Sequence, residues 1–129
     1  MKIAVIGCGK QGRRHLAAFK DLPGVTGLVA ADADPARARS LALDTGAAAT
    51  SVEAALTDGG VGAAVIATPT LTHLALTRRA IDSGKHVLCE KPFGADATAA
   101  RRLAAGAAAA ALIGRVGYLY RFAPAIAEA

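Results

Sequence analysis

The opening residues of the chain combine a short apolar run with closely spaced glycines. Lys2–Ile6 is rich in β-branched residues, which is typical of a buried strand, and residues 11–20 have the apolar spacing of a helix. Between them, Gly7, Gly9 and Gly12 follow the pattern G-x-G-x-x-G. When a strand turns through such glycines into a helix, the unpaired N–H groups of the first helical turn attract an anion. The segment therefore predicts a phosphate-binding strand–turn–helix unit.

Each glycine of this motif has its own expected role. Gly7 permits the tight turn, Gly9 lets the backbone approach a pyrophosphate, and Gly12 lets the helix pack closely on the strand. Lys10 and Gln11 lie in the same turn, so we expect all of these residues to contribute to a nucleotide site. Glycines are common in turns, and it is the position between a strand and a helix that makes the pattern indicate a dinucleotide.

Strands and helices alternate along the rest of the chain. Short apolar runs bounded by turn residues predict strands, and the segments between them have helical spacing. Near-continuously apolar strands separated by helices indicate a parallel sheet covered on both faces. We therefore predict an α/β fold of the Rossmann type, with a doubly wound, mainly parallel sheet of about six strands, in one domain over residues 1–129. The predicted strands are residues 2–6, 25–31, 47–50, 63–67, 86–89 and the region 112–120, and the predicted helices are residues 11–20, 35–44, 51–56 with Ser51 as N-cap, 71–82, and a long alanine-rich helix capped by Asp96 or Thr98.

Asp32 stands at the end of the second predicted strand, 20 residues after Gly12. In a dinucleotide-binding unit, a carboxylate at this place accepts hydrogen bonds from the adenosine ribose hydroxyls, and it repels a 2′-phosphate. We therefore expect the cofactor to be NAD, while the nearby Arg37 keeps NADP as an alternative. The other interpretation of Asp32 is a helix cap ahead of Pro35, a role that Asp34 could fill instead.

Two further loops follow strands at the same edge of the predicted sheet. Thr68 and Pro69 follow the fourth strand, with His73 shortly after, and the segment from Glu90 to Pro92 follows the fifth. Ligands of doubly wound sheets bind beyond the carboxyl ends of the strands, so both loops lie on the cofactor's side. His73 is either a residue that lines the cofactor or a buried structural histidine, since a lone histidine near a helix start is more often structural.

Lys91 is the candidate catalytic residue of this edge. A lysine at the mouth of a cofactor cleft can take part in proton transfer or hydrogen-bond a substrate hydroxyl, and Glu90 could orient it. The alternative is an ordinary exposed lysine with no special chemistry.

Charge and cysteine content argue against other classes of function. The sequence has 15 Lys and Arg against 10 Asp and Glu, a net charge of +5, but its arginines are spread over different predicted helices. They form no basic stripe with interleaved aromatics, so we expect no nucleic-acid partner. Cys8 and Cys89 have no metal-type spacing, which predicts reduced thiols in a cytoplasmic protein and no metal site. The apolar run at the start is too short for a signal peptide or a membrane span, so we expect no membrane partner.

These segments together resemble the N-terminal half of the glucose–fructose oxidoreductase, inositol dehydrogenase and MocA family. The most telling match runs from Gly84 through Glu90 to Pro92, and the resemblance covers essentially the whole chain. One departure is that Gly114 and Arg115 interrupt what should be an apolar last strand. The other matching pieces are residues 6–12 with Arg14 and His15, Asp32, residues 67–69 with His73, residues 116–118, and Arg121, Phe122 and Pro124.

The resemblance implies an oxidoreductase that transfers a hydride between a nicotinamide and a sugar, a cyclitol or a related hydroxyl or keto compound. By this resemblance Lys91 contacts the substrate hydroxyl and assists proton transfer, while Glu90 and Pro92 shape its loop and bind the cofactor. The residues expected to line the nucleotide are Thr68, Pro69 and His73. Members of the family continue into a second α/β domain that supplies most of the substrate pocket, and we expect that domain to lie outside residues 1–129.

The sequence leaves two hypotheses about function open. The chain is either the nucleotide-binding domain of an oxidoreductase, completed by further residues or a partner chain, or a stand-alone dinucleotide-binding module. Such a module would be a sensor, a regulatory subunit or an inactive paralogue. A lone domain of this kind exposes apolar surface that the second domain would cover, so we expect a homo-oligomer or a partner that supplies that domain.

Overall fold

The chain folds around one parallel β-sheet. The strands are β1 (Lys2–Ile6), β2 (Gly27–Ala31), β3 (Ala48–Thr50), β4 (Val61–Ile66), β5 (His86–Cys89) and β6 (Gly114–Val116). They pair in parallel in the order β3-β2-β1-β4-β5-β6, which confirms the predicted Rossmann architecture. The computed structural model describes residues 1–119, so the expectations for Tyr120, Arg121, Phe122 and Pro124 lie outside the described residues. The strand order reverses between β1 and β4, and ligands of such folds bind at this reversal.

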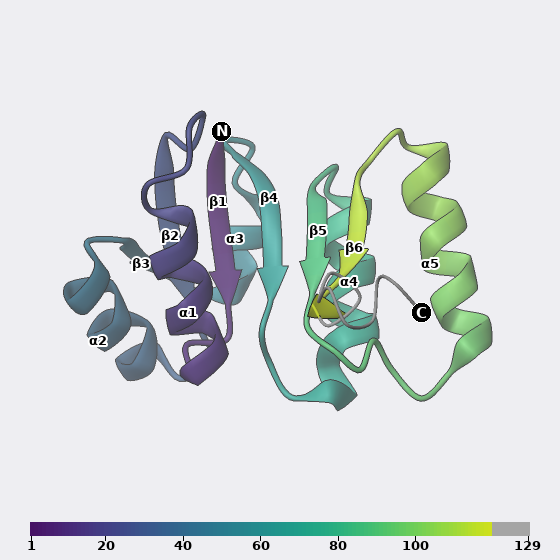
Figure 1. Ribbon diagram of the computed structural model, residues 1–129, viewed down its shortest axis with the longest axis horizontal. Coiled ribbons are helices and arrows are strands. Elements are labelled where there is room, and N and C mark those ends of the chain that lie inside the picture. Colours follow the sequence, from purple (N-terminus) through teal and green to yellow (C-terminus); the bar gives the residue numbers. More distant parts are fainter. Residues whose placement is uncertain (120–129) are drawn as a thin grey trace, which may run out of the picture.

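Helices cover both faces of the sheet (Figure 1). They are α1 (Lys10–Phe19), α2 (Pro35–Thr45), α3 (Val52–Thr57), α4 (His73–Asp82) and α5 (Ala97–Ala109), with a 3₁₀ turn, η1 (Thr70–Thr72), directly before α4. In Figure 1, α1 and α2 lie in front of the sheet, α3 and α4 lie behind it, and α5 stands beside β6. The strand arrows point downward in this view, so the carboxyl ends share the lower edge. None of the helices in residues 1–119 is long and apolar enough to cross a membrane.

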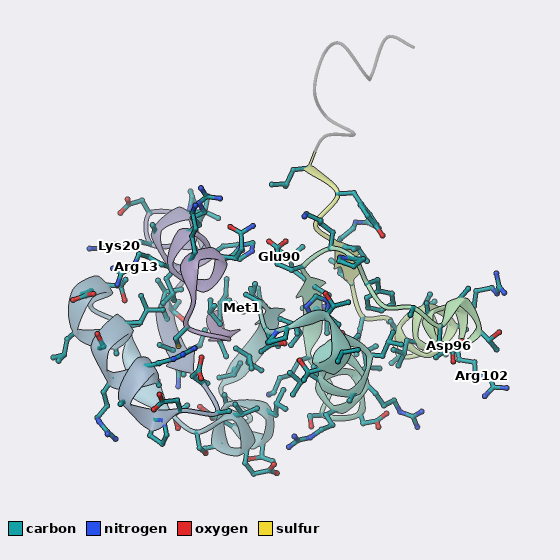
Figure 2. The ribbon with its side chains drawn as sticks, turned by 90° about the horizontal axis from the view of Figure 1, so that it is seen from below. Met1, Arg13, Lys20, Glu90, Asp96 and Arg102 are labelled. Atoms are coloured by element: carbon teal, nitrogen blue, oxygen red, sulfur yellow. The ribbon has the colours of Figure 1, made fainter. Side chains whose placement is uncertain are left out.

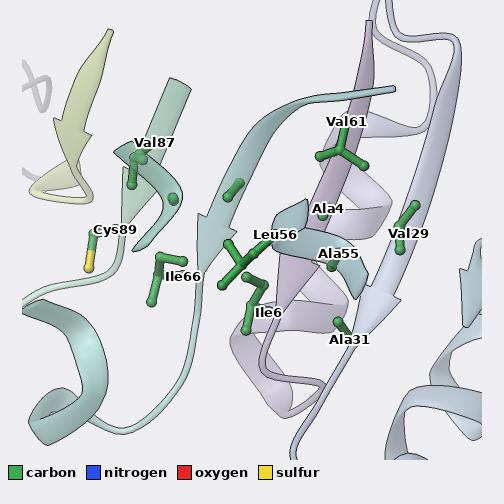
Figure 3. Packing of buried hydrophobic residues seen from close by; sticks show 12 residues of the cluster. Ala4, Ile6, Val29, Ala31, Ala55, Leu56, Val61, Ile66, Val87 and Cys89 are labelled. Atoms are coloured by element: carbon green, nitrogen blue, oxygen red, sulfur yellow. The ribbon is translucent and has the colours of Figure 1, made fainter. Parts of the chain in front are cut away.

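Two apolar cores, one on each face, hold the helices on the sheet. Successive side chains of a strand point to opposite faces. Val5 therefore packs with Leu16 of α1, whereas its neighbour Ile6 packs on the other face against α3. Figure 3 shows this second core, with Leu56 of α3 between Ile6 and Ile66. Because β1 is buried on both faces, nearly all of its residues are apolar, which agrees with the predicted buried strand.

Side-chain caps fix where three of the helices begin. At the start of α2, the Asp34 carboxylate accepts a backbone N–H of the first turn at 2.8 Å, and at α3 the Ser51 hydroxyl does the same at 3.1 Å. Asp96 accepts two N–H groups of α5, at 2.8 and 3.0 Å. The predicted Ser51 cap is confirmed, and Asp96 rather than Thr98 caps α5. Since Asp34 caps α2, Asp32 does not fill that role.

The main differences from prediction lie at the ends of elements. The last strand, β6, has only three residues, and Gly114 and Arg115 belong to it. Gly114 and Arg115 interrupt the apolar pattern of this short, mostly exposed strand, as expected, but they still pair with β5, because pairing uses backbone groups that every non-proline residue carries. The predicted helix over residues 71–82 is split, since residues 70–72 form the tighter η1 turn.

A charged residue is buried at the amino edge of the sheet, opposite the ligand edge. Lys85 is 2% exposed, and its Nζ donates to the carbonyl oxygens of Asp58 and Val61 at 2.8 and 2.9 Å. Burial lowers the pKa of this ammonium, and the two carbonyl bonds offset part of the cost of burying it. Lys85 therefore stabilises the fold at a distance from the candidate site.

Candidate dinucleotide-binding site

The glycine turn after β1 requires glycine at two positions. Gly7 has a φ of 100°, and a Cβ placed on it would lie 2.5 Å from the carbonyl oxygen of Ala67. A Cβ on Gly12 would lie 1.9 Å from the carbonyl oxygen of Gly7, so α1 can approach β1 this closely only without a side chain there. Gly9 has open space where a Cβ would stand. Gly7 and Gly12 therefore shape the turn, and Gly9 faces the space available to a ligand.

The start of α1 carries neither a side-chain cap nor a negative charge. Within residues 1–119, no side chain accepts a hydrogen bond from the first turn of α1, and that turn contains no acidic residue. The first hydrogen bond of the helix runs from the N–H of Arg13 to the carbonyl of Gly9 at 3.0 Å, which leaves the preceding N–H groups outside the helical ladder. These N–H groups and the positive end of the helix dipole favour an anionic group.

Asp32 is fixed directly after β2 by two backbone hydrogen bonds. Its Oδ2 accepts the N–H of Cys8, in the glycine turn, at 2.7 Å, and its Oδ1 accepts the N–H of Asp34 at 2.9 Å. An ionised carboxylate has about four lone-pair sites, so both oxygens keep accepting capacity. The carboxylate is therefore held beside the glycine turn and can still accept hydrogen bonds from two ribose hydroxyls.

Cys8 and Cys89 are free thiols that are poorly suited to nucleophilic chemistry. Burial, followed by the nearby Asp32 carboxylate, raises the pKa of Cys8 to about 11. Burial likewise raises the pKa of Cys89 to about 11. Because the thiolate is the reactive form, both side chains are almost entirely unreactive thiols at neutral pH.

A cleft of about 1520 Å³ lies along this edge of the sheet. Pockets for drug-sized ligands measure roughly 300–1,000 Å³, so the cleft has room for a dinucleotide. The predicted site residues that line it are Gly7, Gly9, Lys10, Gln11, Asp32, Thr68 and Pro69. The predicted site residues that lie outside its lining are Gly12, His73, Glu90, Lys91 and Pro92.

His73 is buried beneath two loops of the site. It is 1% exposed, with Nδ1 2.8 Å from the carbonyl oxygen of Pro92 and Nε2 2.8 Å from that of Thr68. Thr68 follows β4 and Pro92 follows β5, so one ring joins the loops of two neighbouring strands. His73 therefore affects the cleft indirectly, by fixing the positions of the two loops.

The Glu90 carboxylate contacts His15 and the loop backbone, and within residues 1–119 it forms no ion pair with the Lys91 ammonium. Its Oε1 lies 2.8 Å from Nε2 of His15, and its Oε2 accepts the backbone N–H of Lys91 at 3.3 Å. Lys91 is exposed, and its side chain forms no ion pair within residues 1–119; the Lys91–Pro92 peptide bond is cis. Glu90 therefore acts on Lys91 through the backbone of the loop, not by pairing with the ammonium.

His15 is a residue of this edge to which sequence reasoning assigned no role. It lies on α1, stacks on Phe19 with ring centroids 6.1 Å apart, and meets Glu90 from 75 residues away. Figure 2 looks onto the carboxyl edge and shows Glu90 near its centre, beside α1. The sequence held one signal for His15, its place in the family pattern next to Arg14, but local spacing gives no sign of a partner so distant in the chain.

Known proteins share this architecture and its motifs. The model of the Gfo/Idh/MocA family, described as an oxidoreductase family with an NAD-binding Rossmann fold, matches residues 1–118. The chain is 33% identical over 134 residues to inositol 2-dehydrogenase 1 of Saccharopolyspora erythraea, an alignment that covers 99% of this chain and 40% of that protein.

Solved structures give the same result. GenD2 from gentamicin A biosynthesis, in complex with NAD, matches with a TM-score of 0.88 and 32% identity over 96% of this chain and 36% of that chain. KijD10, a 3-ketoreductase from Actinomadura kijaniata in complex with NADP, matches with a TM-score of 0.88 and 29% identity over 99% of this chain and 40% of that chain. The chain spans about two fifths of the length of these relatives. With its glycine turn and its sheet order, the match over nearly all described residues shows that the chain belongs to the glucose–fructose oxidoreductase, inositol dehydrogenase and MocA family of oxidoreductases, as an NAD-binding Rossmann domain.

Proposed function

We propose that the chain binds NAD in the cleft and is the nucleotide-binding part of an oxidoreductase that acts on a sugar, a cyclitol or a related hydroxyl or keto compound. The observation that carries the proposal is the uncapped start of α1 at Gly9, with the fixed Asp32 carboxylate beside it in one cleft. The relatives named as an inositol dehydrogenase and a 3-ketoreductase support this class of substrate.

The residues of the cleft fit the parts of a dinucleotide. The N–H groups at the start of α1 would hold the pyrophosphate, with Gly9 allowing its close approach. Asp32 would accept hydrogen bonds from the adenosine ribose. Lys10 and Gln11 line the cleft at the glycine turn, and Thr68 and Pro69 line it from the β4 loop.

Lys91 is the proposed catalytic residue. A nicotinamide bound in the cleft would supply the hydride chemistry, by which a carbinol carbon is oxidised or a carbonyl carbon is reduced. In the oxidation the hydroxyl proton must also leave, and Lys91 Nζ would accept it as the neutral amine; in the reduction Nζ, as the ammonium, would donate a proton to the carbonyl oxygen. The side chain is exposed and forms no ion pair within the described part of the chain, which leaves its Nζ available to a substrate hydroxyl. Pro92 and Glu90 hold this loop through His73 and His15.

Asp32 favours NAD over NADP in this proposal. A 2′-phosphate on the adenosine ribose would meet its carboxylate, and like charges at short distance are repulsive. Arg37, which could neutralise such a phosphate, lies 3.7 Å from the Asp34 carboxylate in an exposed pair. This exposed pair is weak, so the Asp32 carboxylate is the group that opposes the binding of NADPH.

The test is a fluorescence titration of the chain with NADH and NADPH. We expect NADH to bind more tightly, and Asp32→Ser to weaken NADH binding about tenfold or more, as the loss of hydrogen bonds to a charged group predicts. Asp34→Ser is the matched control, because it removes the same charge two positions away while serine still caps α2. It should keep the preference for NADH.

Two results would contradict the proposal at different levels. Equal or tighter NADPH binding by the unaltered chain would overturn the assignment of Asp32 while leaving a dinucleotide site in place. The absence of binding of both cofactors would overturn the proposed function itself.

The substrate side of the pocket would be completed by a further domain or by a partner chain. The chain spans 40% of the inositol dehydrogenase relative, and Lys91 lines neither of two cavities that the described residues form, one of about 600 Å³ and the cleft of about 1520 Å³. Because the relatives are named as a dehydrogenase and a ketoreductase, the stand-alone module is the less favoured hypothesis.

A further inference from the structure

We infer that His15 is a positioning residue, which holds Glu90 and thereby fixes the Lys91 loop relative to the helix that receives the pyrophosphate. The inference rests on the proposed function and deepens it, because His15 lies outside the lining of the cleft and would act on the site only through other residues.

The first observation is the direct contact between α1 and the end of β5. Nε2 of His15 and Oε1 of Glu90 are 2.8 Å apart, and their side chains are only 17% and 12% exposed. A carboxylate accepts hydrogen bonds, so Nε2 carries the proton and donates. The stack on Phe19, with an interplanar angle of 19°, holds the ring on α1. A half-buried contact with both partners held this way is more constrained than an exposed ion pair.

The second observation is that Glu90 is held on the side of the reacting loop as well. Its own N–H donates to the carbonyl of Ile66 in β4 at 2.9 Å, and its Oε2 accepts the N–H of Lys91. Its carboxylate therefore joins the His15 ring to the backbone of Lys91. The Glu90 side chain thus connects α1 to the Lys91 loop, with one oxygen bonded to His15 and the other to the backbone of Lys91.

The third observation concerns charge. Oε1 is engaged by His15 and Oε2 by a backbone N–H, and within residues 1–119 the Glu90 carboxylate forms no ion pair with the Lys91 ammonium next to it in sequence. If His15 no longer donated, the carboxylate would lose its charge-assisted bond while still half-buried, and the ammonium of Lys91 would be the nearest replacement along the chain. His15 thus keeps the loop in place and Lys91 available.

The test compares His15→Asn with His15→Gln in the full chain. Both variants carry the same amide group, but glutamine is one methylene longer and can place an N–H where Nε2 stands, whereas asparagine is too short. NADH and ADP are the probes, since ADP carries the adenosine and two phosphates but no nicotinamide. We expect His15→Asn to weaken NADH binding about fivefold or more, the lower range of coupling between sites, and to leave ADP binding within about twofold. His15→Gln should bind both probes as the unaltered chain does.

A third variant tests whether the loss of NADH binding comes from the missing donor or from general destabilisation of the chain. His15→Phe preserves the aromatic stack on Phe19 and removes only the donor, so it should behave as His15→Asn does. Equal weakening of NADH and ADP in His15→Asn and His15→Phe would overturn the inference, since that pattern indicates general destabilisation. Unchanged NADH binding in both, or a His15→Gln variant as weak as His15→Asn, would overturn it too. The inference about His15 is tested by the binding affinities of the variants, whereas the proposed function is tested by whether the unaltered chain binds NADH.

Discussion

Cys8 and Cys89 share a raised pKa but differ in what covers them, and this difference is measurable. At pH 8, a thiol whose pKa is about 11 instead of the ordinary 9.0 has a thiolate fraction about 100-fold lower. We predict that iodoacetamide modifies Cys8 about 100-fold more slowly than an ordinary exposed cysteine. Cys89 is fully buried and should react only when the chain unfolds. Mass spectrometry of a timed labelling series, with Cys8→Ser and Cys89→Ser as controls, measures each rate.

Bound NADH should slow the labelling of Cys8 further, because this thiol lies in the turn that the pyrophosphate would cover. Labelling of Cys89 should not depend on NADH in the folded chain. A Cys8 that reacts at the rate of an exposed thiol would contradict the contacts described around it.

At the scale of single residues, the sequence identified those whose role follows from backbone conformation. The spacing of Gly7 and Gly12 was sufficient because a strand that enters a helix needs glycine where the chain approaches itself. The partners of His15 and His73 could not be predicted, because each ring meets segments that only the folded sheet brings near. For His73 the sequence left a structural and a cofactor-lining role open, and the structure agrees with the first. The expectation that Glu90 orients Lys91 changed for the same reason, since the competing partner of the carboxylate lies on α1.

At the scale of elements, the strand–turn–helix unit gives a matched pair of glycine substitutions. A methyl group on Gly12 would collide with the backbone of Gly7, so we predict that Gly12→Ala lowers the free energy of unfolding by about 1–3 kcal/mol or more. A Cβ on Gly9 would meet no atom within 4 Å, so Gly9→Ala should lower the free energy of unfolding by less than about 1 kcal/mol, the range for changes at an N-cap. Urea denaturation followed by circular dichroism measures both values.

The affinity for NADH should separate Gly9→Ala from Gly12→Ala in a different way from stability. The methyl group of Gly9→Ala would stand in the cleft where the pyrophosphate approaches, so we expect a well-folded chain whose NADH affinity falls about tenfold or more. A stable Gly12→Ala variant would contradict the close packing of α1 on β1. A Gly9→Ala variant that binds NADH normally would place the phosphates elsewhere.

The elements that the sequence could predict are those with a buried face. β1 and β4 are apolar because they are covered on both sides, and β5 buries Val87 and Cys89 on one face, so their apolar residues were visible without any structure. A strand in the region 112–120 was predicted and β6 lies there, but its bounds were beyond prediction, because its residues are mostly exposed and its backbone pairing with β5 defines it. The η1 turn was also beyond prediction, because its residues suit a 3₁₀ turn and the first turn of a helix equally well.

At the scale of the whole molecule, the candidate site gathers residues from both halves of the sheet. The glycine turn and Asp32 belong to the half that contains β1 and β2, whereas Thr68 and Lys91 follow β4 and β5 of the other half. The reversal of strand order between β1 and β4 brings these segments to one edge. The sequence could predict this meeting because parallel strands with right-handed crossovers leave few other arrangements.

The molecule also exposes large apolar side chains in the neighbourhood of its last strand. Ile113 is 60% exposed, Tyr118 is 53% exposed and Leu119 is 70% exposed, and they flank β6, the edge strand of the sheet. An edge strand with apolar neighbours is a surface on which another chain can pack. Leu43 is 86% exposed and belongs to α2, which lies at the opposite side of the sheet from β6 (Figure 1), so it stands apart from this group.

We therefore predict that the chain self-associates through the surface around β6. Light scattering over a range of concentrations should give a mass above that of one chain, because association would remove these side chains from water at about 25 cal/mol per Å² of apolar area. Ile113→Lys and Leu119→Lys should lower the measured mass at a given concentration, since each would bury a charge in the contact. Leu43→Lys is the matched control and should leave the mass unchanged, because a leucine exposed on α2 gains charge without touching β6. A chain that stays monomeric at every concentration would rule out this association, and equal effects of all three lysine substitutions would show that added net charge, and not the β6 surface, governs it.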